Sequence, residues 1–186
     1  MPIRVLGIAG SLRTASYNRA LLKAAIELAP PEMTIALFDL APVPMYDADL
    51  DLDGGPAPVQ ALKQAIRDAD ALLIATPEYN YGVPGVLKNA IDWASRAAAD
   101  GARVLNGKPA AIMGATPGMS GTARAQLALR QSFVFTQTYA VAAPEVLIAR
   151  CREKFDAEGR LSDEPTRELV SKLLAALLDW TRRLAR

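Results

Sequence analysis

Histidine is absent from the sequence, and cysteine and aromatic residues are scarce. The 186 residues include no histidine, one cysteine (Cys151) and only 6% aromatic residues. Without histidine, the chain cannot form a Ser-His-Asp triad, an imidazole metal site or an imidazole acid–base catalyst. A single cysteine cannot form a disulfide within the chain, and Cys151 stands in no C-x-x-C or zinc pattern. We therefore expect Cys151 to be a structural thiol of an intracellular protein.

The chain also lacks an excess of charge of either sign. It carries 21 Lys and Arg residues against 20 Asp and Glu residues, a formal net charge of +1. Such a balance offers no general field that would attract nucleic acid or an anionic membrane. A charged ligand must therefore be captured by a local group of residues. We expect a small-molecule partner and no nucleic acid.

Long apolar segments are missing as well. The longest strictly apolar run covers only residues 173–178. The first residues show neither the charged region nor the apolar region of a signal peptide. The sequence therefore predicts no membrane insertion and a cytoplasmic location.

The sequence does contain a repeated alternation of strand-length apolar runs and helix-length amphipathic segments. Strands are predicted over residues 3–9, 34–38, 71–76, 110–115 and 139–142, with 146–148 as a candidate extension of the last. Helices are predicted near residues 21–29, 59–66, 87–94, 122–135 and 169–178. Such an alternation predicts an α/β fold with a doubly wound parallel sheet. We expect one domain over residues 1–186, with the acidic, Pro- and Gly-rich segment 40–58 as a surface loop.

The loop after the first predicted strand carries residue types that bind phosphate. Ser11, Arg13, Ser16 and Asn18 lie within eight positions, directly before a predicted helix. Backbone N–H groups at a helix N-terminus, short polar side chains and a bidentate cation together suit a phosphate. The alternative is a tight turn at Gly10, a helix cap at Ser16 or Asn18, and a solvated Arg13. We favour the phosphate site because the four residue types occur together.

Two standard nucleotide signatures are not met. Gly7 and Gly10 are separated by two residues and lack the third glycine of the dinucleotide fingerprint. Residues 101–108 differ from a Walker loop in glycine spacing, and they precede a strand instead of following one. The first loop is therefore not expected to bind a pyrophosphate.

The loops after the third and fourth predicted strands lie at the same edge of such a sheet and complete a candidate ligand site. Residues 76–85 contain two prolines, two glycines, and the tyrosines Tyr79 and Tyr81, which could flank a flat ring. The alternative is an ordinary turn whose tyrosines pack on the surface. Residues 115–121 are small and could approach a ring closely through backbone groups.

Four motifs stand out along the chain. They are G-S-L-R-x-x-S-x-N-R at 10–19, P-x-Y-D-A-D at 44–49, P-E-Y-N-Y at 77–81 and P-G-x-L-K-N-A-I-D-W at 84–93. Together they resemble the NAD(P)H-dependent FMN reductases of flavodoxin-like fold, and most of all the bacterial quinone and chromate reductases. The resemblance runs over nearly the whole chain and implies a five-stranded sheet of order 2-1-3-4-5, with FMN at its carboxyl edge.

The resemblance also implies site residues. The 5′-phosphate of FMN would be held by Ser11, Arg13, Ser16 and Asn18. The isoalloxazine would be held by Pro77, Glu78, Tyr79, Asn80 and Tyr81, with further contacts from Thr116 and Gly118. No side chain is expected to be a catalytic acid or base, because hydride chemistry belongs to the cofactor. Glu78 either contacts the ring or forms a salt link with a neighbouring arginine.

The predicted function is hydride transfer from NADPH or NADH through bound FMN to a small electron acceptor. Quinones are the favoured acceptors, with free flavins, chromate, azo compounds and nitroaromatics as further candidates. One alternative is a flavodoxin-like electron carrier that does not turn over NAD(P)H. Carriers of that kind tend to be strongly acidic, which the net charge of +1 does not match. A second is a multimeric quinone reductase of the tryptophan-repressor-binding type.

The resemblance suggests a homodimer or a dimer of dimers. The predicted helices over 87–97 and 122–135 carry apolar residues on more than one side, including Trp93, Phe133 and Phe135. The alternative is that Trp93 fills the core of its own subunit. The segment with Met45 and Tyr46 is a candidate for reaching the flavin of a partner subunit.

Overall fold

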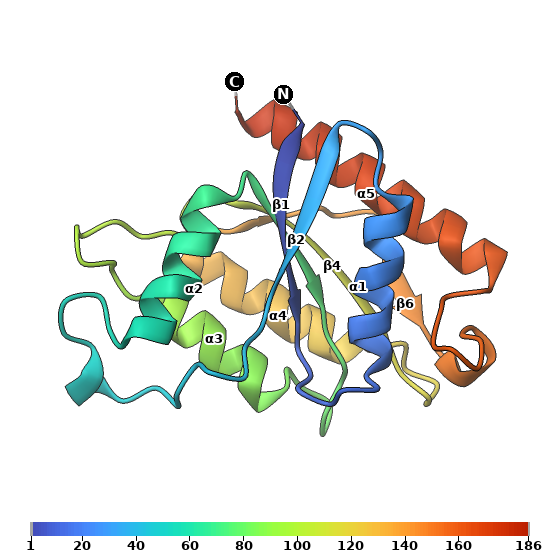
Figure 1. The fold of residues 1–186 in the computed structure, drawn as a ribbon, viewed down its shortest axis with the longest axis horizontal. Helices are drawn as coiled ribbons and strands as arrows, with labels where there is room; N and C mark the ends of the chain where they lie inside the picture. Colours follow the sequence, from blue (N-terminus) through green and yellow to red (C-terminus); the bar gives the residue numbers. More distant parts are fainter. Residues whose placement is uncertain (1, 186) are drawn as a thin grey trace.

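A parallel sheet lies at the centre of the structure, with helices on both of its faces (Figure 1). The structure is a computed structural model and describes residues 2–185. The strands are β1 (Ile3–Ala9), β2 (Met33–Phe38), β3 (Ala71–Ala75), β4 (Pro109–Ala115), β5 (Tyr139–Ala140) and β6 (Val146–Ile148). The α-helices are α1 (Tyr17–Leu28), α2 (Ala57–Asp68), α3 (Gly85–Ser95), α4 (Ala123–Thr136) and α5 (Glu164–Leu184).

The strand order is β2-β1-β3-β4-β5, and every pair is parallel. This confirms the predicted flavodoxin-like order. The predicted fifth strand is two short strands, because β5 and β6 each pair with a different part of β4. Ala140 lies opposite Ala110, and Ile148 lies opposite Ala115 at the carboxyl end.

Two apolar clusters hold the helices to the two faces of the sheet. Successive residues of a strand point to opposite faces, so Val5 belongs to the cluster with residues of α1 and α5, and Leu6 to the cluster with residues of α2, α3 and α4. The apolar stripe predicted for the last helix is buried, as in Leu173 and Leu177. Both faces of β3 and β4 are covered completely, which explains why these strands contain apolar residues at every position.

The segment after β2 is docked on α3 and does not form a free surface loop along its whole length. The carbonyl oxygen of Pro44 accepts hydrogen bonds from Asn89 Nδ2 and from Trp93 Nε1, both at 2.8 Å. The amide nitrogen of Tyr46 donates to Asn89 Oδ1 at 2.7 Å. The Tyr46 ring packs edge-on against the Trp93 ring, with 4.7 Å between the ring centroids. Trp93 is therefore fully buried in its own subunit, which corrects the expectation that it contributes to an outer apolar surface.

A buried lysine holds the far end of the same segment. Lys63 of α2 donates from Nζ to the carbonyl oxygens of Gly54 (2.9 Å) and Ala97 (3.0 Å). Burial lowers its pKa against the opposing attraction of Asp51. Lys63 thus links the segment before α2 to the segment after α3, a role with no sequence signal.

Candidate functional site

Three loops meet at the carboxyl edge of the sheet, at the lower side of Figure 1. They are residues 10–16 after β1, 76–84 after β3 and 116–122 after β4. Ligands of open α/β sheets bind in this position. The three loops are the ones that the sequence predicts, and direct contacts between them or their flanking elements fix their relative positions.

Asn18 joins the first loop to β4. Its Nδ2 donates to the carbonyl oxygen of Ala115 at 3.0 Å, and its Oδ1 accepts from the amide nitrogen of Ala115 at 2.9 Å. The side chain is buried, so both ends of its amide serve this link. Nearby, the amide nitrogen of Gly10 donates to the carbonyl oxygen of Ala75 at 2.8 Å and ties the first loop to β3. Asn18 therefore positions the loop through its amide.

Gly114 allows the third loop to pack against the end of the sheet. A Cβ atom at this position would overlap the hydroxyl of Thr122 and the carbonyl oxygen of Thr76. Thr122 is itself buried in a left-handed conformation, with φ of 69°. Only glycine fits this close approach of two loops.

The first loop contains two serine hydroxyls that accept backbone hydrogen bonds and can still donate one each. The hydroxyl of Ser16 caps α1, accepting from the amide nitrogens of Asn18 (3.2 Å) and Arg19 (3.5 Å). The hydroxyl of Ser11 accepts from the amide nitrogen of Arg13 at 3.4 Å. Both serines are buried, and each hydroxyl still has a hydrogen to donate. Ser16 is therefore the helix cap that the alternative predicts. Its hydroxyl hydrogen can still be donated to a phosphate oxygen.

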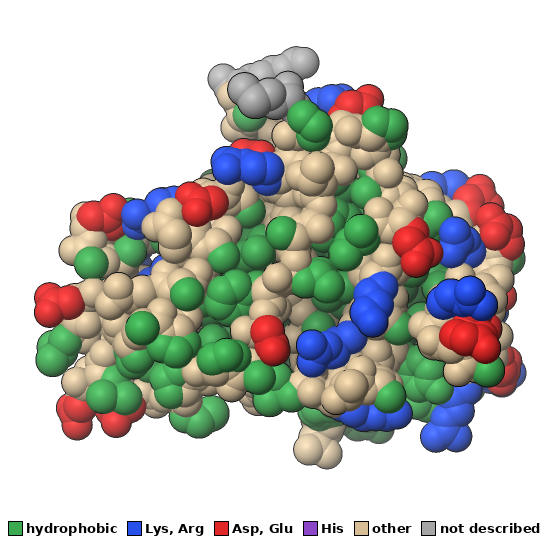
Figure 2. Space-filling model, in the orientation of Figure 1, with side chains coloured by type: hydrophobic (Ala, Val, Ile, Leu, Met, Phe, Trp, Pro, Cys, Tyr) green, Lys and Arg blue, Asp and Glu red, His purple; other side chains and the backbone are tan. Residues whose placement is uncertain are grey.

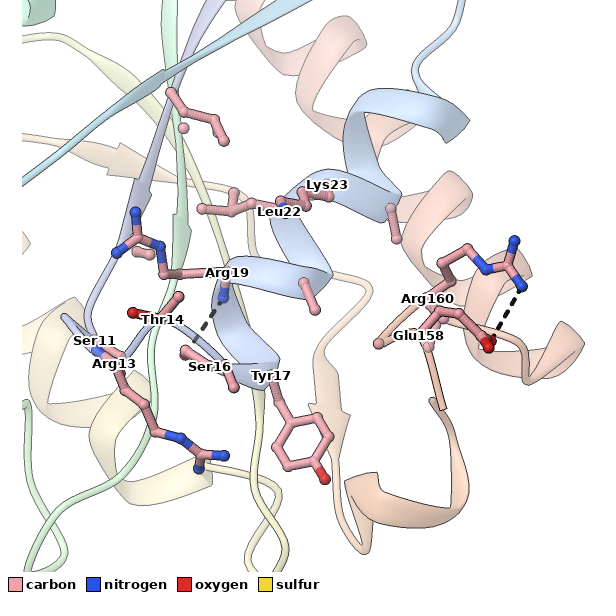
Figure 3. A pocket seen from close by; sticks show the side chains of 18 of the residues that line it. Ser11, Arg13, Thr14, Ser16, Tyr17, Arg19, Leu22, Lys23, Glu158 and Arg160 are labelled. Atoms are coloured by element: carbon pink, nitrogen blue, oxygen red, sulfur yellow. Dashed lines mark hydrogen bonds and ion pairs between the residues drawn. The ribbon is translucent and has the colours of Figure 1, made fainter. Parts of the chain in front are cut away.

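The backbone of this loop and Arg13 complete the set of donors. Within residues 2–185, the amide nitrogens of Leu12, Thr14 and Ala15 have no acceptor, and the Arg13 side chain has no hydrogen-bond or ion-pair partner. Figure 3 shows Arg13 extending below the N-terminus of α1. N–H groups at the positive end of a helix, two hydroxyls and a free guanidinium fit a phosphate monoester.

The second loop forms a tight hairpin turn at the rim of the site. Tyr79 and Gly82 exchange backbone hydrogen bonds of 3.2 and 3.0 Å. Asn80 and Tyr81 between them have φ of 50° and 63°, as in a type I′ turn. A tyrosine in this conformation is uncommon. Both tyrosines are exposed, Tyr81 at 71%.

Glu78 binds the N-terminus of α4. Its Oε2 accepts from the amide nitrogens of Arg124 at 2.9 Å and Ala125 at 3.2 Å, and its Oε1 lies 3.4 Å from the Arg124 guanidinium. The residue at the usual capping position, Thr122, makes no side-chain cap. Glu78 therefore caps a helix that begins 45 residues later in the chain. Of the two predicted roles of Glu78, the structure contains the salt link to an arginine.

The charge of Glu78 is stabilised where it lies. Its side chain is only 6% exposed, and burial by itself would raise its pKa. Hydrogen bonds from the Ala125 amide, the Ser120 hydroxyl and the Arg124 amide, with the Arg124 charge, outweigh burial and lower the pKa. The same guanidinium lies 4.1 Å from the centre of the Tyr81 ring, a cation–π contact. Arg124 thus joins two residues of the second loop.

Backbone hydrogen bonds join the third loop to residues 148–151. The hydroxyl of Thr116 accepts from the amide nitrogen of Gly118 at 3.2 Å. The amides of Arg150 and Cys151 donate to the carbonyl oxygens of Gly118 (2.9 Å) and Thr116 (3.0 Å). Cys151 is fully buried, and burial raises the pKa of its thiol to about 11. Its thiol is therefore protonated at neutral pH, as expected of a structural cysteine.

Two residues that position the site, Asn89 and Arg124, are not among the residues that the sequence predicts for it. Asn89 lies four residues before Trp93 inside one motif, and this helical spacing would have placed both side chains on one face. Arg124 gives no signal in the sequence, because its contact with Glu78 spans 46 residues.

The site offers phosphate-binding donors, an aromatic rim and small backbone loops. Within residues 2–185, no group of His, Cys, Asp and Glu residues could hold a metal ion, and no helix combines the length and apolarity needed to cross a bilayer. Fold and site together define the class as a flavodoxin-like protein whose carboxyl edge suits a ligand with one phosphate and a flat ring.

Comparison with known proteins specifies the family. The model of the NADPH-dependent FMN reductase family matches residues 3–153, and the chain belongs to this family. It is 53% identical over 182 residues to an NAD(P)H-dependent FMN reductase of Pseudomonas aeruginosa, covering 98% of this chain and 97% of the relative. It is 40% identical over 182 residues to a 2-hydroxy-1,4-benzoquinone reductase of a Burkholderia species, covering 98% of each.

A solved structure agrees with this assignment. The flavoenzyme NAD(P)H:(acceptor) oxidoreductase FerB of Paracoccus denitrificans superposes with a TM-score of 0.86 at 36% identity, covering 97% of this chain and 98% of the other. The predicted family is confirmed, and with it the prediction of an oxidoreductase that uses FMN and NAD(P)H.

Proposed function

We propose that the three loops hold FMN and that the enzyme uses NAD(P)H to reduce small acceptors of the quinone class. The observation that carries the proposal is the first loop, where backbone and side-chain donors without partners lie at the N-terminus of α1. One phosphate suits this donor set. Two relatives named for quinone reduction, one from Burkholderia and one from Escherichia coli, support the acceptor class.

Within the first loop, Ser11, Arg13 and Ser16 would contact the phosphate directly. Within the described residues, their hydroxyls and guanidinium donate to no other acceptor. Asn18, although predicted as a phosphate ligand, would act mainly by fixing the loop to Ala115. This arrangement keeps the donors in place before the ligand arrives, which reduces the entropy lost on binding.

Residues 77–81 would hold the isoalloxazine, assisted by Thr116 and Gly118. FMN, when bound, would supply the redox chemistry between NAD(P)H and the acceptor. The chain's own contribution is position and electrostatics. The amide nitrogens of Glu78 and Asn80 have no acceptor within residues 2–185 and would donate to polar atoms of the ring. Glu78 keeps this backbone in place from the α4 side.

The test is reduction of the purified, yellow protein by NADPH and by NADH without any partner protein. Rapid bleaching of the flavin absorbance is expected, followed by reoxidation with quinones, free flavins, azo dyes, nitroaromatics or chromate supplied one at a time. Quinones should give the highest kcat/KM of this panel. A flavin that stays oxidised with both nicotinamides would instead identify a flavodoxin-like electron carrier. Chromatography of the flavin released by heat should yield FMN, and FAD would contradict the single-phosphate site.

A homodimer, or a dimer of dimers, is part of the proposal. Phe133 is buried in the core of its own subunit, but three apolar side chains of α4 remain exposed: Leu127, Val134 at 80% and Phe135 at 78%. Such a group is unusual on a monomer of this size. Light scattering after size-exclusion chromatography should give twice or four times the subunit mass, and Phe135→Asp should lower it. The exposed Met45 is the candidate for reaching a partner's flavin.

We place the enzyme in the cytoplasm.

A further inference from the structure

A cavity of about 720 Å³ begins at the first loop and continues around α1. Ser11, Arg13 and Ser16 line its end at the sheet edge, where the proposed FMN phosphate lies. Beyond them the cavity extends along α1 to the end of β2 on one side and to residues 156–161 on the other. A phosphate monoester would occupy only its mouth.

Cations without partners line the cavity on the β2 side. Within residues 2–185, the side chains of Arg19 and Lys23 have no hydrogen bond or ion pair, like that of Arg13. By contrast, Arg160 on the other side of α1 is paired with Asp156 at 2.8 Å and with Glu158 at 3.4 Å. Figure 3 shows the ion pair of Arg160 with Glu158 and the separate position of Arg19.

The acidic side chains of the cavity offset these cations only in part. A carboxylate oxygen of Glu27 lies 3.9 Å from the guanidinium of Arg167 in α5. Glu27 is therefore paired on the α5 side of the cavity and not on the β2 side. Asp39 lies at the end of β2, where one of its carboxylate oxygens accepts from the Ala41 amide at 3.1 Å. Two cations without partners, Arg19 and Lys23, thus stand against one carboxylate, that of Asp39, on the β2 side.

The floor of this part of the cavity is apolar. Leu37 of β2 is 48% exposed beside the buried Leu22 of α1. Gly7 lies between them, and a Cβ at Gly7 would lie 2.7 Å from Leu37 Cδ2. The absence of a side chain at Gly7 therefore leaves room for Leu37 and Leu22 to form this apolar surface. On the face drawn in Figure 2, Lys and Arg side chains gather beside hydrophobic side chains over the sheet.

Figure 3 shows that Arg13 and Arg19 extend in opposite directions from the start of α1. Arg13 reaches below the helix N-terminus, whereas Arg19 reaches over the strands. The two guanidinium groups therefore point to different parts of the cavity. The β2 side would suit a ligand with anionic groups for Arg19 and Lys23 and a flat apolar part for the floor.

We propose that the β2 side of this cavity binds the adenosine diphosphate half of NAD(P)H, with Arg19 and Lys23 as the contacts to its phosphates. The inference rests on the proposed function, in which the nicotinamide half lies against the flavin. The adenine ring would cover Leu37. The carboxylate of Asp39 would repel the 2′-phosphate that only NADPH carries. We therefore assign Arg19 and Lys23 to the pyrophosphate, which NADPH and NADH share.

The test compares ligands that contain or lack the adenosine diphosphate half. Titration calorimetry of the FMN-loaded protein with ADP-ribose should show about tenfold weaker binding for Arg19→Gln and for Lys23→Gln, the value of one charge-assisted contact. The KM for NADPH and NADH should rise by the same factor at unchanged kcat. The KM for reduced nicotinamide mononucleotide, which lacks this half, should stay unchanged. Lys23→Arg should retain binding.

Arg182→Gln is the matched control, since Arg182 lies at the far end of α5 near the chain termini (Figure 1). ADP-ribose binding unchanged in both Arg19→Gln and Lys23→Gln would overturn the inference. So would an equal rise in KM for reduced nicotinamide mononucleotide, because the effect would then come from the flavin site or the fold. A wild-type protein that oxidises neither the dinucleotides nor the mononucleotide would refute the proposed function itself, whereas ADP-ribose titration still reports on the cavity.

Discussion

Glu78 offers the sharpest test of how the site is held together. Its carboxylate accepts two backbone hydrogen bonds at the start of α4 and pairs with Arg124, while the helix has no side-chain cap of its own. Losing an ordinary cap costs about 1 kcal/mol, and each buried donor left without a partner costs about 1–3 kcal/mol. Glu78→Ala should therefore lower the free energy of unfolding of the FMN-free protein by about 2–3 kcal/mol.

Glu78→Gln keeps one acceptor oxygen and loses the charge, so about half of that loss is expected. Urea unfolding at pH 7 measures both, with the exposed Glu145→Gln as the matched control. The pKa of Glu78 is lowered from the ordinary 4.5, so its charge stabilises the fold above about pH 4.5. That stabilisation is lost as the pH falls through the folded pKa. The difference between wild type and Glu78→Gln should accordingly shrink in acid.

Two outcomes would refute this reasoning. Glu78→Gln could destabilise the protein no more than Glu145→Gln does, which would mean that the cap contributes nothing. Alternatively, Glu78→Gln could leave unfolding unchanged and weaken FMN binding tenfold or more. Glu78 would then be a contact to the ring and not a positioning residue.

The remaining predictions concern the phosphate contact, the reaction sequence and the loop packing. Arg13→Ala should weaken FMN binding about 10- to 100-fold, the value of one charge-assisted contact to a phosphate, while riboflavin, which lacks the phosphate, should bind as before. Equal losses for both flavins in a fluorescence titration would remove Arg13 from the phosphate site. NADPH and a quinone should give parallel double-reciprocal lines, because donor and acceptor use the same flavin face in turn; intersecting lines would require a second acceptor site. Gly114→Ala should lower the free energy of unfolding by about 3 kcal/mol or more, because the new Cβ overlaps a backbone carbonyl and a buried hydroxyl. A thermal transition close to that of the wild type would show that the loops can separate there.

The sequence by itself determined the features that arise from near neighbours. Apolar runs and helical spacing predicted the β-α alternation, because a strand or a helix must bury its own side chains within a few residues. The apolar stripe around Leu173 and the loop from Ser11 to Ser16 were predicted in this way. The strand order came from family motifs, since periodicity does not say which strands are neighbours.

Only the tertiary structure decided what distant residues do to one another. Asn18 was predicted as a phosphate ligand, but its amide is bonded to Ala115, 97 residues away. Trp93 is buried against the segment that contains Pro44, 49 residues earlier, whose carbonyl oxygen accepts its indole N–H. Lys63 is a helix residue of ordinary type that becomes buried between two loops. In each case the partner is a backbone carbonyl, a group that every residue carries. Which carbonyl is free and within reach depends on how the whole chain folds, so no residue type in the sequence marks it.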